Sequence, residues 1–205
     1  MNHSPLRIRK VAVLGAGVMG AQIAAHLVNA DVETILFDLP AREGPKSGIA
    51  IKAIANLGKL SPAPLAETSR ALAITPANYD EHLDLLKGCD LIIEAIAERL
   101  DWKLDLYKKI APYVSDSAFI ASNTSGLSIN ALAEALPAAM RPRFSGIHFF
   151  NPPRYMHLVE LIPDHQTDPA LLSGLEAFLT TTLGKGVVHA KDTPNFIGNR
   201  IGVFS

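Results

Sequence analysis

The sequence predicts an α/β protein with a doubly wound, mostly parallel sheet and a C-terminal strand hairpin added at its edge. Three observations predict it. Short apolar runs alternate with helical patterns, the runs are apolar on consecutive residues, and a glycine-rich turn joins the first strand to the first helix. Consecutive apolar residues are typical of parallel strands covered by helices on both faces. With 205 residues, 48% of them hydrophobic, the chain can bury a sizeable core.

The expected parallel strands are β-branched or apolar runs that have helical segments between them. They lie at Val11–Leu14, Thr34–Phe37, Ala71–Ile74, Leu91–Ile93 and Ala118–Ala121. This order of elements is that of successive βαβ units.

After about residue 140 the pattern changes. Two closely spaced strands, Phe144–Phe150 and Met156–Ile162, flank the turn-rich Asn151-Pro152-Pro153-Arg154 and predict the hairpin. Asp168 is expected to cap a helix with Pro169 at its first position, running to about Leu183. One more strand is expected at Lys185–Ala190.

The final residues predict the start of another helix. Thr193-Pro194 opens it, and the sequence stops at Ser205 without a glycine, proline or charged residue that would end a helix. The chain therefore looks truncated before a further domain, although an abrupt natural end is the alternative.

Composition excludes several classes of protein. The 19 basic and 20 acidic residues are spread along the chain, so neither nucleic acid nor a membrane surface is an expected partner. The uncharged run 11–30 contains three glycines and the polar Gln22, His26 and Asn29, so we interpret it as a strand and a helix, not a membrane span. The lone Cys89 and the lack of a signal-like opening predict a cytoplasmic protein.

The first strand is followed by glycines at G-x-G-x-x-G spacing. Gly15 would permit the tight turn, Gly17 would let a pyrophosphate approach the backbone, and Gly20 would allow close packing of helix and strand. The helix N-terminus attracts phosphate, so the whole turn is a candidate phosphate site: Gly15, Ala16, Gly17, Val18, Met19 and Gly20. A glycine-rich turn that serves packing alone is the competing interpretation.

The second strand ends in Asp38, eighteen residues after Gly20. A carboxylate there accepts hydrogen bonds from a ribose 2′-hydroxyl and repels a 2′-phosphate, which predicts NAD and not NADP. An aspartate that merely begins the loop before Leu39-Pro40 is the alternative.

A histidine and a glutamate are brought together by the hairpin. His148 lies in an apolar run, and reflection through a turn centred on Arg154 places Glu160 opposite it. A carboxylate orients an imidazole and stabilises its protonated form, so His148 could accept a proton from an alcohol. A structural pair that closes the hairpin remains the alternative. His157 is expected on the opposite strand face from Glu160, so a metal site of these three residues is not expected.

Several longer motifs together resemble the 3-hydroxyacyl-CoA dehydrogenase family over nearly the whole chain. They are Gly15–Gly20, Ser122–Ser125, His148–Pro152, Glu160 and Lys191–Arg200. Residues 151–155 and 193–201 are most similar to bacterial bifunctional proteins whose dehydrogenase module comes first and whose enoyl-CoA hydratase module comes last.

The resemblance implies roles for particular residues. It makes His148 the catalytic base with Glu160 as its partner, and it places Ser125 and Asn199 around the reacting oxygen and the nicotinamide. It also implies NAD contacts from Glu98, Lys103, Ser125 and Asn151, and more weakly a coenzyme A contact from Lys59.

The implied organisation is an NAD-binding Rossmann domain over residues 1–192, followed at 193–205 by the start of a helix leading to an absent C-terminal helical domain. The implied reaction is NAD-dependent oxidation of a 3-hydroxyacyl-CoA in fatty-acid β-oxidation, with no metal. The loop between Ser125 and His148 looks slightly longer than in single-function members. Because the absent domain would supply much of the acyl-CoA cleft and the usual dimer surface, we expect weak activity from these residues alone.

Two other functions stay open at this stage. One is an NAD-linked dehydrogenase of a free 3-hydroxy acid, and the other is a non-catalytic NAD-binding protein. A hydratase module in the same parent chain and a homo-oligomer also stay open.

Overall fold

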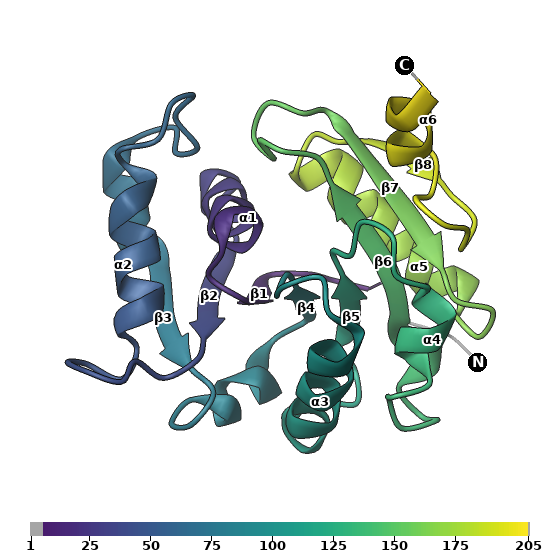
Figure 1. Cartoon of the computed structure of the whole chain (residues 1–205), viewed down its shortest axis with the longest axis horizontal. Helices are drawn as coiled ribbons and strands as arrows, with labels where there is room; N and C mark the ends of the chain where they lie inside the picture. Colours follow the sequence, from purple (N-terminus) through teal and green to yellow (C-terminus); the bar gives the residue numbers. More distant parts are fainter. Residues whose placement is uncertain (1–5, 205) are drawn as a thin grey trace.

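The computed structural model describes residues 6–204, which contain one eight-stranded sheet with helices on both faces (Figure 1). The strands lie in the order β3-β2-β1-β4-β5-β6-β7-β8. Their bounds are β1 Lys10–Leu14, β2 Glu33–Asp38, β3 Ile74–Asn78, β4 Leu91–Glu94, β5 Phe119–Ser122, β6 Phe144–Phe149, β7 Leu158–Pro163 and β8 Gly186–His189.

Strands β1 to β6 run parallel to one another, and the direction reverses only between β6 and β7. The predicted doubly wound sheet and its hairpin are therefore confirmed. Strand β8 pairs with β7 in parallel, so the sheet extends one strand beyond the hairpin.

The α-helices are α1 Val18–Asn29, α2 Gly48–Leu57, α3 Leu100–Ile110, α4 Ile129–Ala133, α5 Pro169–Ala177 and α6 Gly198–Phe204. Shorter 3₁₀ turns are η1 Thr68–Ala73, η2 Leu83–Gly88, η3 Ala111–Tyr113 and η4 Arg141–Arg143, and a π-turn, η5 Phe178–Thr182, continues α5. Asp168 caps α5 as predicted, since its side chain accepts a hydrogen bond from the Ala170 backbone N–H.

The core has two halves because successive residues of a strand point to opposite faces. Val11 and Val13 of β1 pack into the half that holds side chains of α1 and α5. Ala12 and Leu14 pack into the half that holds side chains of α3 and α4. Burial on both faces explains why the sequence of β1 is apolar without alternation.

The third strand lies later than predicted. Residues 71–73 belong to the 3₁₀ turn η1, and Leu72 is 91% exposed, so only Ile74 of the predicted Ala71–Ile74 is in β3. Strand β3 includes Pro76, which lacks a backbone donor. The proline is tolerated because β3 is an edge strand that pairs only with β2.

The last helix also starts later than predicted. Thr193-Pro194 leads into a turn in which Asn195 and Phe196 both have positive φ angles, of 64° and 48°, and α6 begins only at Gly198. Positive φ is uncommon for residues with a side chain, so tertiary contacts must hold this turn. Those contacts belong to the candidate site and are described below.

The uncharged run 11–30 forms β1, the glycine turn and α1. Within residues 6–204, no helix is both long and apolar enough to cross a membrane.

The predicted packing role of Gly20 allows a direct test. A Cβ on Gly20 would lie 1.8 Å from the carbonyl oxygen of Gly15, which itself turns with φ of 106°. We expect Gly20→Ala to lower the free energy of unfolding by more than about 2 kcal/mol and the melting temperature by about 5 °C or more.

Gly17→Ala is the matched control, because a Cβ there meets no atom within 4 Å. Its melting temperature should stay within about 2 °C of the parent value. Equal losses in both variants, measured by thermal denaturation, would contradict this role of Gly20.

Candidate active site

The glycine turn lies where the carboxyl end of β1 meets the N-terminus of α1. Gly17 is the residue before α1 and offers no side chain to cap it, so the first backbone N–H groups of the helix have no side-chain partner there. The space beside Gly17 is open, and the residue lines a cavity. An open backbone at a helix N-terminus is suited to a phosphate.

Asp38 lies at the end of β2, beside this turn. One carboxylate oxygen accepts the backbone N–H of Ala16 at 2.5 Å, and the other accepts that of Leu39 at 2.7 Å. The carboxylate is partly exposed and lines the same cavity. Its contact with the glycine turn does not exhaust its capacity, because each carboxylate oxygen can accept more than one hydrogen bond.

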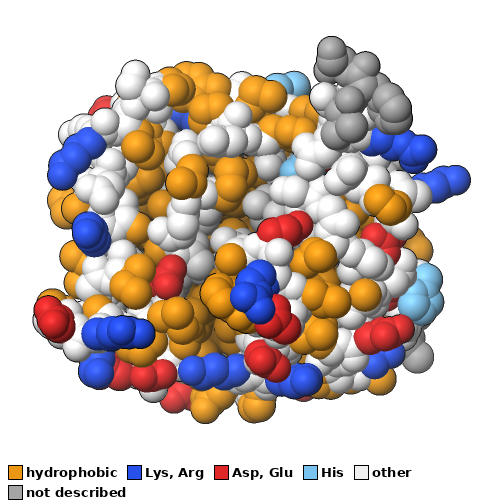
Figure 2. Space-filling view, in the orientation of Figure 1, with side chains coloured by type: hydrophobic (Ala, Val, Ile, Leu, Met, Phe, Trp, Pro, Cys, Tyr) orange, Lys and Arg blue, Asp and Glu red, His pale blue; other side chains and the backbone are white. Residues whose placement is uncertain are grey.

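The cavity has a volume of about 540 Å³ and lies between β2 and α3. On the face shown in Figure 2, hydrophobic side chains gather in the region between these two elements. Tyr79 and Trp102 both line the cavity, and the Tyr79 hydroxyl is buried without a hydrogen-bond partner among residues 6–204. A buried orphan hydroxyl, an open backbone cradle and the Asp38 carboxylate suit the adenosine and pyrophosphate of NAD.

Glu98 holds the loop that follows β5. Its carboxylate accepts hydrogen bonds from the Thr124 hydroxyl and from the backbone N–H groups of Ser125, at 2.8 Å, and Gly126, at 3.1 Å. Burial alone would raise the pKa of Glu98, but these hydrogen bonds and the nearby Lys103 ammonium lower it below its usual value. Glu98 is therefore ionised at neutral pH.

Lys103 is placed differently from a surface ligand. Its side chain is 1% exposed, and its ammonium lies 2.6 Å from Glu94 and 3.5 Å from Glu98. Both neighbours are carboxylates, so the charge of Lys103 is already partnered inside the protein. A direct contact of Lys103 with NAD stays a prediction.

The pair expected from the hairpin is present. His148 lies opposite Glu160 in the register of β6 and β7, and its Nδ1 is 2.7 Å from a Glu160 oxygen. The imidazole is 4% exposed and packs against the rings of Phe150 and Phe196, at centroid distances of 4.6 and 5.9 Å. Because a carboxylate only accepts, Nδ1 carries the hydrogen, and no group within residues 6–204 is bonded to Nε2.

The second Glu160 oxygen explains the turn before α6. It accepts the backbone N–H groups of Ile197 and Gly198, each at 2.8 Å. Phe196, just before them, is buried against His148. One carboxylate thus orients the histidine and holds the turn whose positive φ angles replace the expected first turn of helix.

That turn brings Asn199 to the Ser125 loop. The Asn199 side-chain amide donates a hydrogen bond to the Ser125 backbone carbonyl at 3.1 Å. On the other side of the loop, Asn123 accepts the backbone N–H of Phe149, the neighbour of His148, at 2.9 Å. Hydrogen bonds therefore connect the segments that carry the four residues expected at the reacting centre, which are His148, Glu160, Ser125 and Asn199.

Asn151 and Lys59 lie further out. The Asn151 side chain accepts a hydrogen bond from Gln22 of α1 at 3.2 Å, so it faces the helix that begins at the glycine turn. Lys59 is exposed just after α2, with Asn56 3.5 Å from its ammonium. Its role towards coenzyme A stays a prediction.

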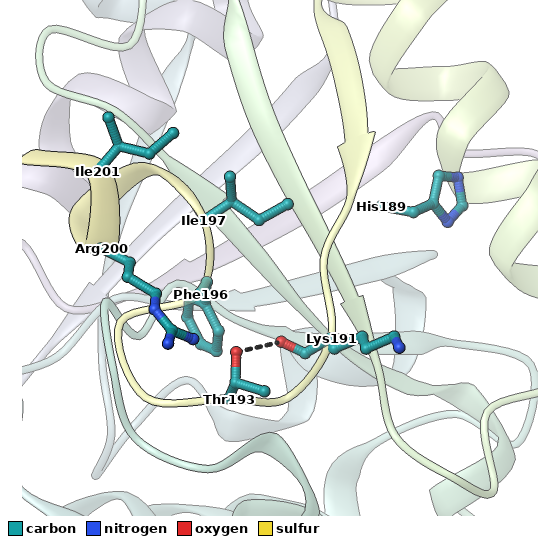
Figure 3. Close-up of a pocket in the computed structure, with 7 residues that line it drawn as sticks. All are labelled: His189, Lys191, Thr193, Phe196, Ile197, Arg200 and Ile201. Carbon is teal, nitrogen blue, oxygen red and sulfur yellow. Dashed lines mark hydrogen bonds between the residues drawn. The ribbon is translucent and has the colours of Figure 1, made fainter.

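A second cavity, of about 770 Å³, lies beside β8 (Figure 3). It is lined by His189, Lys191, Thr193, Phe196, Ile197, Arg200 and Ile201. It contains none of the residues predicted for catalysis or for NAD.

Two other sequence expectations concern His157 and the metal. His157 precedes β7 and is exposed, in contact with Gly186, so it is apart from the His148 pair. Within residues 6–204, no group of three His, Cys, Asp or Glu side chains is arranged to hold a metal ion.

Sequence reasoning missed Glu94, Thr124 and Asp192. Glu94 is a fully buried acid at the end of an apolar strand, a pattern that could have indicated a buried ion pair. Asp192 accepts hydrogen bonds from the Ser128 hydroxyl and three groups of Ile129 and Asn130, and so joins α4 to the segment before α6. No local pattern could have paired residues 62 to 64 positions apart.

The comparisons with known proteins agree with this geometry. Residues 10–193 match the model of the family "3-hydroxyacyl-CoA dehydrogenase, NAD binding domain". A "Probable 3-hydroxyacyl-CoA dehydrogenase" of Deinococcus radiodurans is 44% identical over 200 residues, which cover 97% of this chain and 58% of that protein. A "Fatty acid oxidation complex subunit alpha" of Psychrobacter cryohalolentis is 36% identical over 95% of this chain and 26% of its own.

Solved structures give the same result. The crystal structure of (S)-3-hydroxybutyryl-CoA dehydrogenase from Ralstonia eutropha has a TM-score of 0.78 and 34% identity, covering 95% of this chain and 68% of that one. This chain spans less than two thirds of the length of the two curated relatives named above. The matched family is defined by an NAD-binding domain, which confirms the expected cofactor. The chain therefore belongs to the family of 3-hydroxyacyl-CoA dehydrogenase NAD-binding domains.

Proposed function

We propose that this chain is the NAD-binding part, carrying the catalytic base, of an enzyme that oxidises a 3-hydroxyacyl-CoA to the 3-ketoacyl-CoA. The observation that carries the proposal is the buried His148–Glu160 pair, in which the imidazole Nε2 has no hydrogen-bond partner within the described residues 6–204. The proposed division is residues 1–192 as the NAD-binding domain and 193–205 as the start of a helix leading onward. The proposal concerns the whole parent protein, since the chain covers only part of its relatives.

The cofactor would be held along the carboxyl ends of the parallel strands. The glycine turn and the N-terminus of α1 would bind the pyrophosphate, and Asp38 would bind the adenosine ribose. Glu98, Ser125 and Asn151 are the proposed NAD contacts beyond the ribose. A contact from Lys103, whose ammonium lies 3.5 Å from Glu98, is proposed beside them. When bound, NAD supplies the acceptor for a hydride.

The proposed proton path uses His148 as a general base. Nε2 takes the proton of the substrate hydroxyl while Glu160, hydrogen-bonded at Nδ1, stabilises the positive charge that the ring acquires. The two backbone N–H groups on the other Glu160 oxygen keep that carboxylate in place. We assign Ser125 and Asn199 to positioning the reacting oxygen, supported by the hydrogen bond between them.

The coenzyme A portion would contact Lys59. The loop after Lys59 is bound to the hairpin turn, because Arg154 donates to the carbonyls of Ala63 and Leu65, at 2.8 and 2.7 Å. This link supports a substrate that extends from His148 towards the end of α2.

Assaying a 3-hydroxyacyl-CoA beside its free acid, with the full-length parent, tests the substrate: equal turnover would favour the free-acid dehydrogenase.

We further propose that the parent acts in fatty-acid β-oxidation, with a hydratase module in the same chain. The support is the relative of Psychrobacter cryohalolentis, of which this chain matches 26% and whose name is that of a fatty acid oxidation complex subunit. We also propose a reducing, cytoplasmic location, supported by the single cysteine, Cys89, which is buried as a thiol.

Replacing Asp38 tests the cofactor assignment. Asp38→Ala should weaken NAD binding by about tenfold, because hydrogen bonds to a charged group are worth about 1.5–3 kcal/mol. Affinity for NADP should change less or rise, because the repulsion of the 2′-phosphate is removed. Calorimetric titration of both dinucleotides measures the effect, and unchanged affinities for both would refute the assignment.

Replacing His148 tests the base. In the full-length parent, His148→Gln should lower kcat by about 10²–10⁴, the usual contribution of general-base catalysis, with little change in the dissociation constant of NAD. His157→Gln is the control and should keep full activity, since His157 is exposed and outside the pair. A His148→Gln enzyme with unaltered kcat would favour a non-catalytic NAD-binding protein.

A further inference from the structure

We propose that Glu94 is a positioning residue that holds in place two loops of the NAD cleft, the one after β4 and the one after β5, through buried hydrogen bonds. Glu94 ends β4 and is 0% exposed, so it cannot itself touch a bound cofactor. The inference rests on the proposed function, because the loops in question are those that would contact NAD.

The Glu94 carboxylate makes four contacts. One oxygen accepts the backbone N–H of Ile96 at 2.8 Å and lies 2.6 Å from the Lys103 ammonium. The other oxygen accepts the hydroxyls of Ser122, at 2.7 Å, and Tyr107, at 3.0 Å. Two of the four partners lead directly to loops of the cleft.

The Ile96 contact holds the loop after β4. Ile96 and its neighbours on either side line the cavity beside the glycine turn, and Glu98 follows two residues later. The Ser122 contact leads to the loop after β5, because the Ser122 hydroxyl oxygen accepts the backbone N–H of Thr124 at 3.3 Å. Lys103 joins the two routes, since its ammonium also lies 3.5 Å from Glu98, which binds the 124–126 turn.

Stability alone is a weak reason to bury the Glu94–Lys103 ion pair. Removing two charges from water is costly, and replacing a buried ion pair by packed apolar residues is often neutral or stabilising. A satisfied buried network does specify one arrangement of the groups bonded to it. Besides Lys103 and Tyr107 of α3, the groups bonded to Glu94 are Ile96 and Ser122, which lie at the start of the loops after two strands that are neighbours in the sheet.

Two hydroxyl deletions of similar size separate positioning from general stability. Ser122→Ala removes a donor to Glu94 that leads into the 123–126 loop, while Tyr107→Phe removes a donor to the same oxygen that comes from the middle of α3. Both should lower the melting temperature by a few degrees. Only Ser122→Ala should weaken NAD binding, by about five- to tenfold.

Glu94→Gln should have the largest effect on NAD affinity, about tenfold or more, because it removes the charge that partners Lys103. Glu134→Gln, an exposed acid in the turn after α4, is the matched control and should bind NAD as the parent chain does. Equal NAD affinity in the Ser122→Ala and Tyr107→Phe variants would overturn the inference.

Amide hydrogen exchange supplies a readout that needs no bound cofactor. Ser122→Ala should speed exchange in residues 123–126, and Glu94→Gln should speed it in both 95–99 and 123–126, whereas Tyr107→Phe should leave both loops as they are. If the parent chain fails to bind NAD, the proposed function fails while the exchange pattern still decides the role of Glu94. If Glu94→Gln does not fold, the two hydroxyl variants alone decide it.

Discussion

The register of the β6–β7 hairpin is the constraint on which the rest of the site depends. It places Glu160 opposite His148, where the Glu160 carboxylate contacts both the imidazole and the turn before α6. One oxygen orients the imidazole, and the other holds the backbone of residues 197 and 198. A slip of one residue would turn Glu160 to the other face of the sheet, which would remove both contacts at once.

The cleft built around this pair has two chemically different ends. At the glycine turn, open backbone and the Asp38 carboxylate are available to a ligand. At the hairpin, both Glu160 oxygens accept hydrogen bonds within the protein, and among residues 6–204 no group is bonded to the imidazole Nε2. Between these two ends, Glu98 in the loop after β4 accepts hydrogen bonds from the turn after β5 that carries Ser125. Groups free to bind a dinucleotide at one end and an oriented histidine at the other are consistent with a dehydrogenase of this family.

Much of this could be predicted from local sequence. The glycine spacing and the run into Asp38 are set by neighbours in sequence, and the His148–Glu160 pair follows from counting through a short hairpin. The failures came where distant contacts decide. The apolar residues 71–73 lie in a 3₁₀ turn, where Leu72 is 91% exposed. Pro76 is tolerated because β3 is an edge strand. The turn before α6 is held by hydrogen bonds from Ile197 and Gly198 to Glu160 and not by helix propensity. Lys103 lies 2.6 Å from Glu94 and 3.5 Å from Glu98, ion pairs that no local pattern encodes, and its contact with NAD stays a prediction.

A crystal structure of this chain with NAD bound would test the proposed binding mode and the place of the catalytic base together. We expect the adenosine ribose hydrogen-bonded to Asp38, the pyrophosphate over the N-terminus of α1, and the nicotinamide ring in contact with the Ser125 loop on the side of His148. An adenosine ribose away from Asp38, a nicotinamide directed away from His148, or a dinucleotide bound in the cavity beside β8 would contradict it.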